Sequence, residues 1–309
     1  MTDESVPTGA EAFALIGRVL DVERTGETTF AAQSHPHVNR RIYGGQVLAQ
    51  SLIAAGRTVA SDRYVHSLHG YFLRPGDPDV PLELAVEVLH DGRSFSARRT
   101  HAVQDGVPIL SLIASFQEDQ EGFEHAIEVP PDVPAPEELP SSDDVFRSDP
   151  AIIRRYLAPK TAFDIRSVEP QIYLGPDPSG SPVQATWVRA HGELPAWAER
   201  SARAALLAYA CDQVVLEPVL RAHGMSWSTP GLSVASLDHA MWWRRDVDVT
   251  QWLLFVQASP TASGGRGLGT IRVYDGESRL VATIAQEGMV RLRDAAARAA
   301  RSPQGPTEP

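Results

Sequence analysis

The chain has 309 residues, 43% of them hydrophobic, and a formal net charge of −11. This length suits two domains better than one, and the composition is that of an ordinary globular protein. No run of about 18 apolar residues is present to cross a bilayer, and the first residues lack the pattern of a secretory signal. A single cysteine, Cys211, excludes an internal disulfide. We therefore expect a cytoplasmic protein without membrane insertion.

The negative charge is concentrated in one segment. Residues 118–150 contain eleven Asp or Glu side chains, one arginine and six prolines. Such a composition is typical of an extended linker. The rest of the chain is close to neutral, which argues against nucleic acid or an anionic membrane as a partner. We predict an N-terminal domain over 11–118, a linker over 119–150, a C-terminal domain over 151–292, and disordered ends at 1–10 and 302–309.

The first half of the chain reads as one helix followed by antiparallel strands. The pair Gly44-Gly45 leads a predicted helix over 45–60. Turn signals such as Asp105-Gly106 then separate short apolar-polar alternations. These alternations predict strands at 64–73, 82–90, 95–104 and 107–117.

The second half has the same order of elements. A helix is predicted over 198–217, ended by Pro218. Strands are predicted at 232–244, 252–261, 267–275 and 279–290. A long helix packed on an antiparallel sheet is an α+β arrangement. We expect the two sheets to pair edge to edge, because pairing covers an otherwise exposed strand in each.

Two matched motifs indicate that the halves arose by duplication. The segment Ser67–Arg74 matches Ser236–Arg244, and Val103–Gly106 matches Val273–Gly276. Both pairs are separated by about 170 residues. Repetition at one fixed spacing is the signature of an internal repeat.

Asp212 is the polar residue that helical periodicity singles out. On a helical wheel of 198–217 it lies on the apolar stripe, within about 60° of Ala208 and Tyr209. The wheel assigns Arg203, Gln213 and Glu217 to the opposite, solvated face. A carboxylate on an apolar face is costly to bury unless hydrogen bonds or a cavity satisfy it. A structural and a functional role are equally compatible with this pattern. The helix predicted in the first half has no acidic residue.

The last strand and the one after the second helix supply further polar candidates. Gln286 shares its strand face with Ala282 and Ile284, which directs its amide towards the helix side. Ser236 begins a strand. By themselves, both residues fit a structural role better than a catalytic one. Asp238 and His239 are adjacent on a strand and should therefore point to opposite faces, so they are not expected to act as a pair.

Other catalytic motifs are absent. The sequence has no GxSxG nucleophile elbow, no GxGxxG segment and no Walker A segment. His35 and His37 have no third ligand at a spacing that suits a metal, so no metal site is predicted. Cys211 is interpreted as a small buried hydrophobic residue.

Six segments resemble the acyl-CoA thioesterase II (TesB-type) family. They are Tyr43–Gln46, His66–Gly76, Asp91–Arg99, Ala114–Gln117, Leu237–Trp242 and Gln286–Gly288. The segments occur in the family's order from about residue 40 to 290. The resemblance implies a double hotdog, in which each half is a long helix wrapped by an antiparallel sheet. It also implies hydrolysis of acyl-CoA to free fatty acid and CoA by an activated water, without metal, cofactor or covalent intermediate.

The resemblance places the catalytic residues in the second half, at Asp212, Ser236 and Gln286. Asp212 would take a proton from the water, while Ser236 and Gln286 would hold that water. Ser236 is a departure, because well-known members carry threonine there. We expect backbone N–H groups near a helix start to stabilise the oxyanion.

The substrate and the assembly are predicted more coarsely. Acyl-CoA carries several negative charges, and arginines are candidate contacts for its phosphates. The candidates are Arg93, Arg98, Arg99, Arg244, Arg245 and Arg266. By resemblance, the chain is expected to form a homodimer or homotetramer.

Two other functions fit the same fold. A hotdog enoyl-CoA hydratase would bind the same ligand but normally shows a Gly-Asp-x-Asn-Pro-x-His stretch, which is absent here. A non-catalytic acyl-CoA-binding module would have no need of an acid such as Asp212 on an apolar face.

Overall fold

The computed structural model describes residues 8–35, 41–144 and 161–293. Three predicted regions lie wholly or mostly outside these ranges: the disordered ends, the last residues of the linker, and the start of the second domain at 151. No helix within the described ranges is long and apolar enough to span a membrane.

Within residues 8–35 and 41–117, the first half contains two helices and six strands. In chain order they are α1 (Gly9–Leu20), β1 (Glu23–Arg24), β2 (Thr29–Ala32), α2 (Gly44–Gly56), β3 (Tyr64–Phe72), β4 (Leu82–Asp91), β5 (Phe95–Gln104) and β6 (Val107–Gln117). The predicted strands agree with β3 to β6 within one residue at each end. Helix α2 starts at the glycine pair, as predicted, and ends four residues earlier than expected.

The second half repeats this plan. After the short helix η1 (Pro136–Glu138) come β7 (Phe163–Ser167), β8 (Val183–Ala190), α5 (Arg200–Cys211), α6 (Glu217–Ala222), β9 (Leu232–Ser236), β10 (Asp238–Trp243), β11 (Leu253–Ser263), β12 (Arg266–Tyr274) and β13 (Leu280–Leu292). The strand predicted over 232–244 is two strands, because the chain changes partners at Leu237. Before it, β9 pairs with the end of β13; after it, β10 pairs with both β13 and β3.

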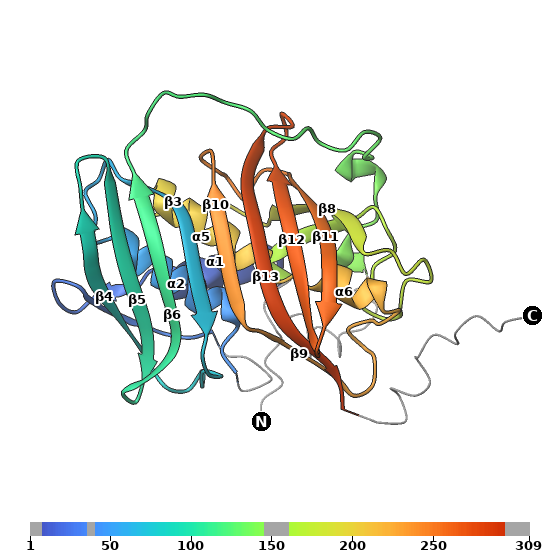
Figure 1. Ribbon diagram of the computed structural model, residues 1–309, viewed down its shortest axis with the longest axis horizontal. Coiled ribbons are helices and arrows are strands. Elements are labelled where there is room, and N and C mark those ends of the chain that lie inside the picture. Colours follow the sequence, from blue (N-terminus) through green and yellow to red (C-terminus); the bar gives the residue numbers. More distant parts are fainter. Residues whose placement is uncertain (1–7, 36–40, 145–160, 294–309) are drawn as a thin grey trace, which may run out of the picture.

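All the strands belong to one antiparallel sheet. Its order is β1-β2-β4-β5-β6-β3-β10-β13-β12-β11-β8-β7, with β9 paired to β13. The halves meet where β3 pairs with β10, with Leu68 opposite Met241. The predicted edge-to-edge pairing is therefore confirmed. Figure 1 shows the central strands in front, with α2 and α5 behind them.

The two long helices form the centre of the core. Eleven of the thirteen residues of α2 are buried, as expected of a helix that is covered on all sides. Helices α2 and α5 run in opposite directions. The start of α2 meets the end of α5, where the Gly45 N–H bonds to Asp212. Near its end, a Cβ at Gly56 would lie 3.5 Å from the Ser201 Cβ at the start of α5.

The prediction of one continuous helix over 198–217 is wrong. Helix α5 ends at Cys211, turns follow, and α6 starts at Glu217. Pro218 lies in the first turn of α6, where its missing N–H costs nothing, so it begins a helix and does not end one. The turn segment lies so close to the sheet that a Cβ at Gly269 would be 1.9 Å from the Val215 carbonyl oxygen. A glycine at 269 is therefore required.

The break in the helix also corrects the predicted solvated face. Gln213 and Glu217 are both buried. The Glu217 carboxylate accepts hydrogen bonds from Gln184 Nε2 at 3.1 Å and Trp227 Nε1 at 3.0 Å. A buried charge of this kind needs such partners to be tolerated. The predicted face was wrong because a helical wheel applies only while the helix continues.

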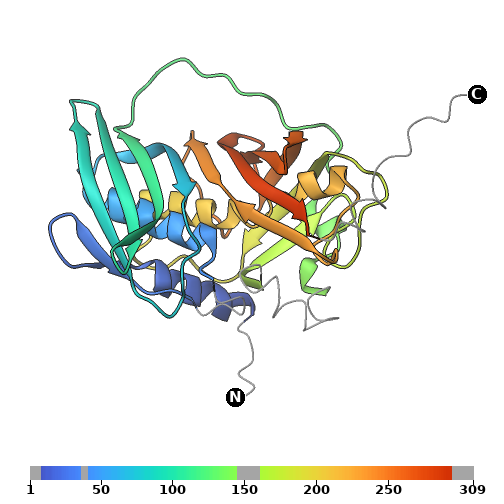
Figure 2. The ribbon, with the colours of Figure 1, turned by 60° about the horizontal axis from the view of Figure 1, so that its bottom comes forward.

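The described part of the predicted linker is extended between β6 and η1. Figure 2 shows it leaving β6 and arching away from the body before it reaches the second half. No helix or strand forms between β6 and η1. Near η1 this segment is held by its backbone carbonyls: Trp187 Nε1 donates to the Pro134 oxygen at 2.9 Å, and Arg166 Nη1 donates to the Pro136 oxygen at 2.8 Å.

Candidate active site

Asp212 lies where the end of α5 meets the start of α2. As the residue that caps α5, it turns its carboxylate towards three donors. Gly45 N–H donates to Oδ2 at 2.7 Å, Ser236 Oγ donates to Oδ1 at 3.2 Å, and Gln286 Nε2 donates to Oδ1 at 2.9 Å. The α2 N-terminus adds a favourable dipole, because its partial positive charge faces the carboxylate. These contacts satisfy the acid that periodicity placed on an apolar face.

Gln286 joins the other two predicted residues. It lies on β13 with none of its surface exposed. Its Nε2 donates to Ser236 Oγ at 2.8 Å as well as to Asp212. The structure therefore brings Asp212, Ser236 and Gln286 together as one hydrogen-bonded group. The two-residue period of the strand had indicated the correct face for Gln286.

The glycine pair at the start of α2 makes this close approach possible. A Cβ at Gly44 would lie 3.0 Å from Asp212 Oδ2, and one at Gly45 would lie 2.6 Å from the Tyr43 ring. Tyr43 in turn donates from its hydroxyl to the Tyr209 carbonyl oxygen at 2.7 Å. This hydrogen bond ties the start of α2 to the last turns of α5, so the distance between Gly45 and Asp212 is set by both helices.

His239 is a functional candidate that the sequence did not reveal. It is fully buried on β10, and its Nδ1 is hydrogen-bonded to Gln286 Oε1. Burial lowers its pKa, so the ring is neutral and can donate from Nδ1. That bond fixes which end of the Gln286 amide faces Asp212. Asp238 points elsewhere and accepts from the Glu287 N–H at 2.7 Å, so the expectation that Asp238 and His239 do not act as a pair is confirmed.

Cys211 is not a nucleophile. It is a free, fully buried thiol. Burial, and then the charge of Asp212, raise the pKa of this thiol well above its usual value. A protonated thiol in an apolar environment is inert. The interpretation of Cys211 as a small buried hydrophobic residue is confirmed.

A pocket of about 590 Å³ opens beside Asp212 and Ser236. Of the described residues that line it, Asp212 alone is acidic. Most of its wall is apolar and comes from both halves of the chain: Ile42, Val47, Phe72, Leu110, Leu216 and Val234. Two exposed arginines, Arg41 and Arg74, also line it. The pocket can thus hold an alkyl chain against a carboxylate and an anion near the arginines.

The six arginines predicted to contact phosphates lie away from the Asp212 pocket. The sequence lists the cations but does not show which of them face a pocket. None of the six lines the Asp212 pocket. Arg98 is buried and donates to Asp91 and to backbone oxygens, which is a structural role. Arg99 pairs with Glu87 and Arg266 with Glu287. The Arg93 carbonyl accepts from Arg63. Arg244 and Arg245 line a second cavity.

No group of three His, Cys, Asp or Glu side chains gathers as metal ligands would in residues 8–35, 41–144 and 161–293. The polar atoms beside the pocket belong instead to carboxylate, hydroxyl, amide and backbone N–H groups. Such groups can position a water and accept its proton.

Family models match both halves of the chain. A model of the acyl-CoA thioesterase N-terminal domain matches residues 31–117, and one of the acyl-CoA thioesterase C-terminal domain matches residues 129–290. The chain belongs to the acyl-CoA thioesterase family. Acyl-CoA thioesterase 2 of Haemophilus influenzae is 33% identical over 283 residues, covering 89% of this chain and 96% of that protein.

Solved structures of similar proteins share the fold. Acyl-CoA thioesterase II TesB2 from Mycobacterium marinum matches with a TM-score of 0.71 at 36% identity, covering 90% of this chain and 98% of that one. A protein with a hot dog fold from Alicyclobacillus acidocaldarius matches with a TM-score of 0.74 at 19% identity, covering 90% and 98%, and bears on the fold alone. The predicted family, double hotdog and acyl-CoA thioesterase activity are confirmed. Neither the hydratase nor the non-catalytic alternative is favoured.

Proposed function

We propose that this thioesterase acts through Asp212, with Ser236 and Gln286 holding the attacking water. The observation that carries the proposal is the hydrogen-bonded group of these three side chains, two of which line the apolar pocket. A thioester carbonyl needs a positioned water, a base and a donor for the developing oxyanion. The proposal assigns the base to Asp212 and the positioning of the water to Ser236 and Gln286.

The proposed reaction runs in two steps. A water between Asp212 and Ser236 takes over one of the Gln286 hydrogen bonds and loses a proton to the Asp212 carboxylate. Its oxygen forms a bond to the thioester carbon, which gives a tetrahedral intermediate. When the intermediate collapses, the carbon–sulfur bond breaks and the proton passes from Asp212 to the sulfur. The products are a free fatty acid and CoA.

The oxyanion donor is proposed at the start of α2. Gly44 is the first residue of this helix and lines the pocket. Its N–H has no hydrogen-bond partner among the residues that the structure describes. Unpaired N–H groups at a helix N-terminus bind anions because the helix dipole and the free donors act together. The donors near Asp212 thus include one that the carboxylate itself does not use.

The substrate is proposed to lie with its acyl chain on the apolar wall and its phosphates near Arg41 and Arg74. Both guanidinium groups are on exposed residues. Arg74 is also held in place, because its Nη1 donates to the Pro108 carbonyl oxygen at 2.8 Å. These two arginines replace the six that the sequence suggested.

We also propose an assembly, a location and domain limits. A homodimer or homotetramer would cover apolar side chains at the centre of the sheet, where Tyr71 is 62% exposed and Ile113 is 41% exposed. Exposed apolar groups of this kind mark interaction surfaces. A cytoplasmic location and domains at 11–118 and 151–292 remain our proposals.

The test is Asp212→Asn, assayed by thiol release on acyl-CoAs of increasing chain length. Asparagine preserves the shape of the side chain but cannot accept the proton, so kcat should fall by about 10²–10⁴ on every substrate. Arg266→Gln, which changes an exposed residue away from the pocket, is the matched control and should leave kcat unchanged. A folded Asp212→Asn protein with activity within about threefold of the unmodified protein would remove Asp212 from the mechanism.

A further inference from the structure

The pocket beside Asp212 runs along the whole length of β9. All five residues of this strand, Leu232–Ser236, line it. One edge of β9 is open to the pocket, because among the strands that the structure describes β9 pairs with β13 alone. Successive residues of a strand are about 3.3 Å apart, so Leu232 lies about 13 Å along the strand from Ser236. The pocket therefore extends well beyond the three hydrogen-bonded side chains.

The surface that β9 offers to this pocket is apolar. Ser236, Val234 and Leu232 share one face of the strand, because strand side chains alternate between faces. None of the five residues of β9 is charged. The two apolar side chains rest on a small buried cluster, which consists of Ile172, Leu220 and Met225. A continuous apolar surface thus leads away from the Ser236 hydroxyl and is suited to an alkyl chain.

Trp227 lies at the far end of this surface and also lines the pocket. Two consecutive turns fold the chain back at this point. The Thr229 N–H donates to the Ser226 carbonyl oxygen at 3.0 Å, and the Leu232 N–H donates to the Thr229 carbonyl oxygen at 3.2 Å. Trp227 also packs on the same buried cluster as Leu232. It is therefore placed at the opposite end of β9 from Ser236.

Trp227 is held both by its backbone and by its ring. Its N–H donates to the Ile172 carbonyl oxygen at 2.9 Å, and its Nε1 donates to Glu217 Oε1 at 3.0 Å. Glu217 is 4% exposed, and its other carboxylate oxygen accepts from Gln184 Nε2 at 3.1 Å. A hydrogen bond to a charged group is stronger than one between neutral groups. The indole therefore resists displacement by a ligand that presses against it.

The wall that the first half supplies carries the positive charge of the pocket. Arg41 and Arg74 line the pocket on this side, next to the exposed Leu73. A thioester substrate extends in two directions from its carbonyl group, with CoA on the sulfur side and the alkyl chain on the other. When the CoA phosphates lie at the arginines, the wall formed by β9 is left for the alkyl chain.

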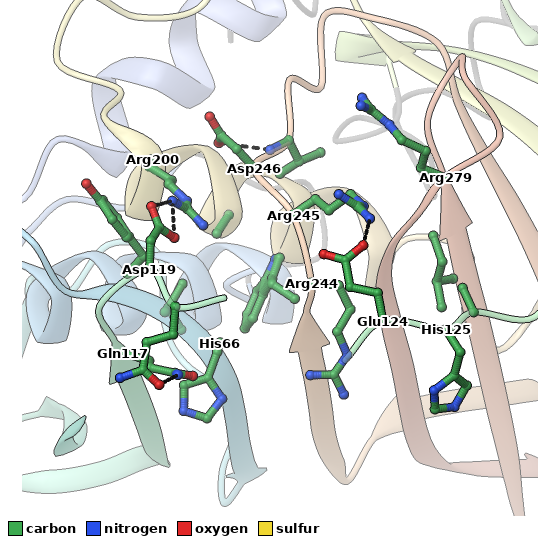
Figure 3. Close-up of a pocket in the computed structure, with 18 of the residues that line it drawn as sticks. His66, Gln117, Asp119, Glu124, His125, Arg200, Arg244, Arg245, Asp246 and Arg279 are labelled. Carbon is green, nitrogen blue, oxygen red and sulfur yellow. Dashed lines mark hydrogen bonds and ion pairs between the residues drawn. The ribbon is translucent and has the colours of Figure 1, made fainter. Parts of the chain in front are cut away.

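The second cavity, of about 800 Å³, offers no comparable surface. Figure 3 shows the charged side chains that gather around it. Asp119 pairs with Arg200 at 2.7 Å, and Glu124 pairs with Arg245 at 3.0 Å. An alkyl chain in this cavity would displace water from charged groups without replacing its hydrogen bonds, which is unfavourable. The Asp212 pocket is therefore the better site for the alkyl chain.

We propose that the acyl chain of the substrate lies along β9 from Ser236 to Leu232, and that Trp227 forms the end of the pocket and limits the chain length. This inference rests on the proposed function, because it assumes that the thioester is hydrolysed beside Asp212. Trp227 then determines specificity by contacting the end of the alkyl chain and not the reacting atoms. A chain longer than the path from Ser236 to Trp227 must bend or leave its last methylene groups in water.

The test compares kcat/KM for palmitoyl-CoA with kcat/KM for hexanoyl-CoA in each variant. Trp227→Leu should raise the palmitoyl-to-hexanoyl ratio by about tenfold or more, because one further methylene group in an apolar pocket changes discrimination by about that factor. Leu232→Phe narrows the pocket and should lower the ratio by about tenfold. The ratio does not depend on how much of a variant is folded, so partial unfolding does not obscure the result.

Each variant has a matched control. Trp252→Leu makes the same change at a tryptophan that does not line the pocket, where Arg166 and Arg189 lie over the ring. Leu73→Phe repeats the second change on the wall that the first half supplies. Both controls should leave the ratio unchanged. A ratio that changes in Leu73→Phe but not in Leu232→Phe would place the alkyl chain on the other wall and overturn the proposal.

A ratio within about twofold of the unmodified protein in either Trp227→Leu or Leu232→Phe would also overturn the proposal. The Asp212→Asn variant separates this failure from a failure of the proposed function. Unchanged ratios together with an inactive Asp212→Asn protein would reject only the path of the acyl chain. A folded and active Asp212→Asn protein would reject the mechanism itself, whatever the ratios.

Discussion

Ser236 stands where the resemblance leads us to expect threonine. Its hydroxyl accepts from Gln286 and donates to Asp212, so the hydroxyl, and not the rest of the side chain, connects the group. Ser236→Thr should therefore retain activity, whereas Ser236→Ala should lower kcat by about 10²-fold. Steady-state kinetics on one good acyl-CoA would measure both.

The Ser236→Thr variant is also the control for this position, because it keeps the hydroxyl and restricts its rotamer. Circular dichroism should show the same fold in both variants. If alanine supported the same kcat as serine, the hydroxyl would not hold the water, and the role of Ser236 would be wrong.

His239 should make the stability of the fold sensitive to acid. Burial lowers its pKa in the folded chain, whereas in the unfolded chain it has the ordinary value of about 6.5. Below that value the unfolded chain takes up a proton that the folded chain does not. The stabilisation is therefore complete above about pH 6.5 and is lost as the pH falls, at up to about 1.4 kcal/mol per pH unit.

Urea unfolding between pH 7.5 and 5 would measure this loss. His239→Gln, which can still donate to Gln286, should reduce the slope relative to the unmodified protein. His125→Gln changes an exposed residue and serves as the control. Equal slopes in the unmodified protein and His239→Gln would show that another group carries the titration.

Individual residues were predictable only where they follow a local period. Asp212 and Gln286 could be placed on apolar faces because helices and strands repeat along the chain. His239 could not be linked to Gln286, since their contact joins residues 47 positions apart. The sequence did not single out the arginines of the Asp212 pocket for a related reason. Arg41 and Arg74 differ from other surface arginines only in where the fold puts them.

At the scale of elements, the end of α5 depends on glycines in the sheet. A Cβ at Gly269 would lie 1.9 Å from the Val215 carbonyl oxygen, and backbone atoms cannot move aside as a side-chain end can. Gly269→Ala should lower the free energy of unfolding by about 2 kcal/mol or more, as overpacking does. Because the displaced turn follows Asp212 directly, kcat should fall too.

Gly276→Ala is the matched control in the hairpin after the same strand. A Cβ at Gly276 meets nothing within 4 Å, so its unfolding free energy should stay within about 0.5 kcal/mol. Chemical denaturation of the two variants gives the comparison. Equal stabilities would mean that the turn after α5 can relax, and that Gly269 does not position it.

The break after Cys211 could not be predicted from sequence, although most strands were. The apolar period continues through residues 212–217, so the pattern alone favours one helix. The segment packs against Gly269 on β12, which follows it by more than 50 residues. The strands, by contrast, are bounded by local signals such as Asp105-Gly106, where both residues adopt positive φ angles.

At the scale of the whole molecule, the repeat predicted the architecture and its asymmetry. The matched segments around residues 67 and 236 became β3 and β10, which join the halves. The first half supplies the start of α2, with Gly44 and Gly45, to a site whose acid belongs to the second half. The proposed catalytic site is therefore built from both halves, and the end of α2, the duplicated position, carries no carboxylate to act as a base.

Gln286 and Gln117, from the last strand of each half, test this asymmetry. Gln286 donates to Asp212 and Ser236. Gln117 instead donates to Gln120 at 3.1 Å and lines the second cavity.

Gln286→Ala should lower kcat by about 10²-fold or more, because it removes a donor placed for the reacting water. Gln117→Ala should leave kcat nearly unchanged, with any effect on KM or stability. Both purified variants, checked by circular dichroism, would be assayed on the same acyl-CoA. Equal losses of kcat would mean that both halves carry out the reaction, contrary to the absence of a base at the end of α2.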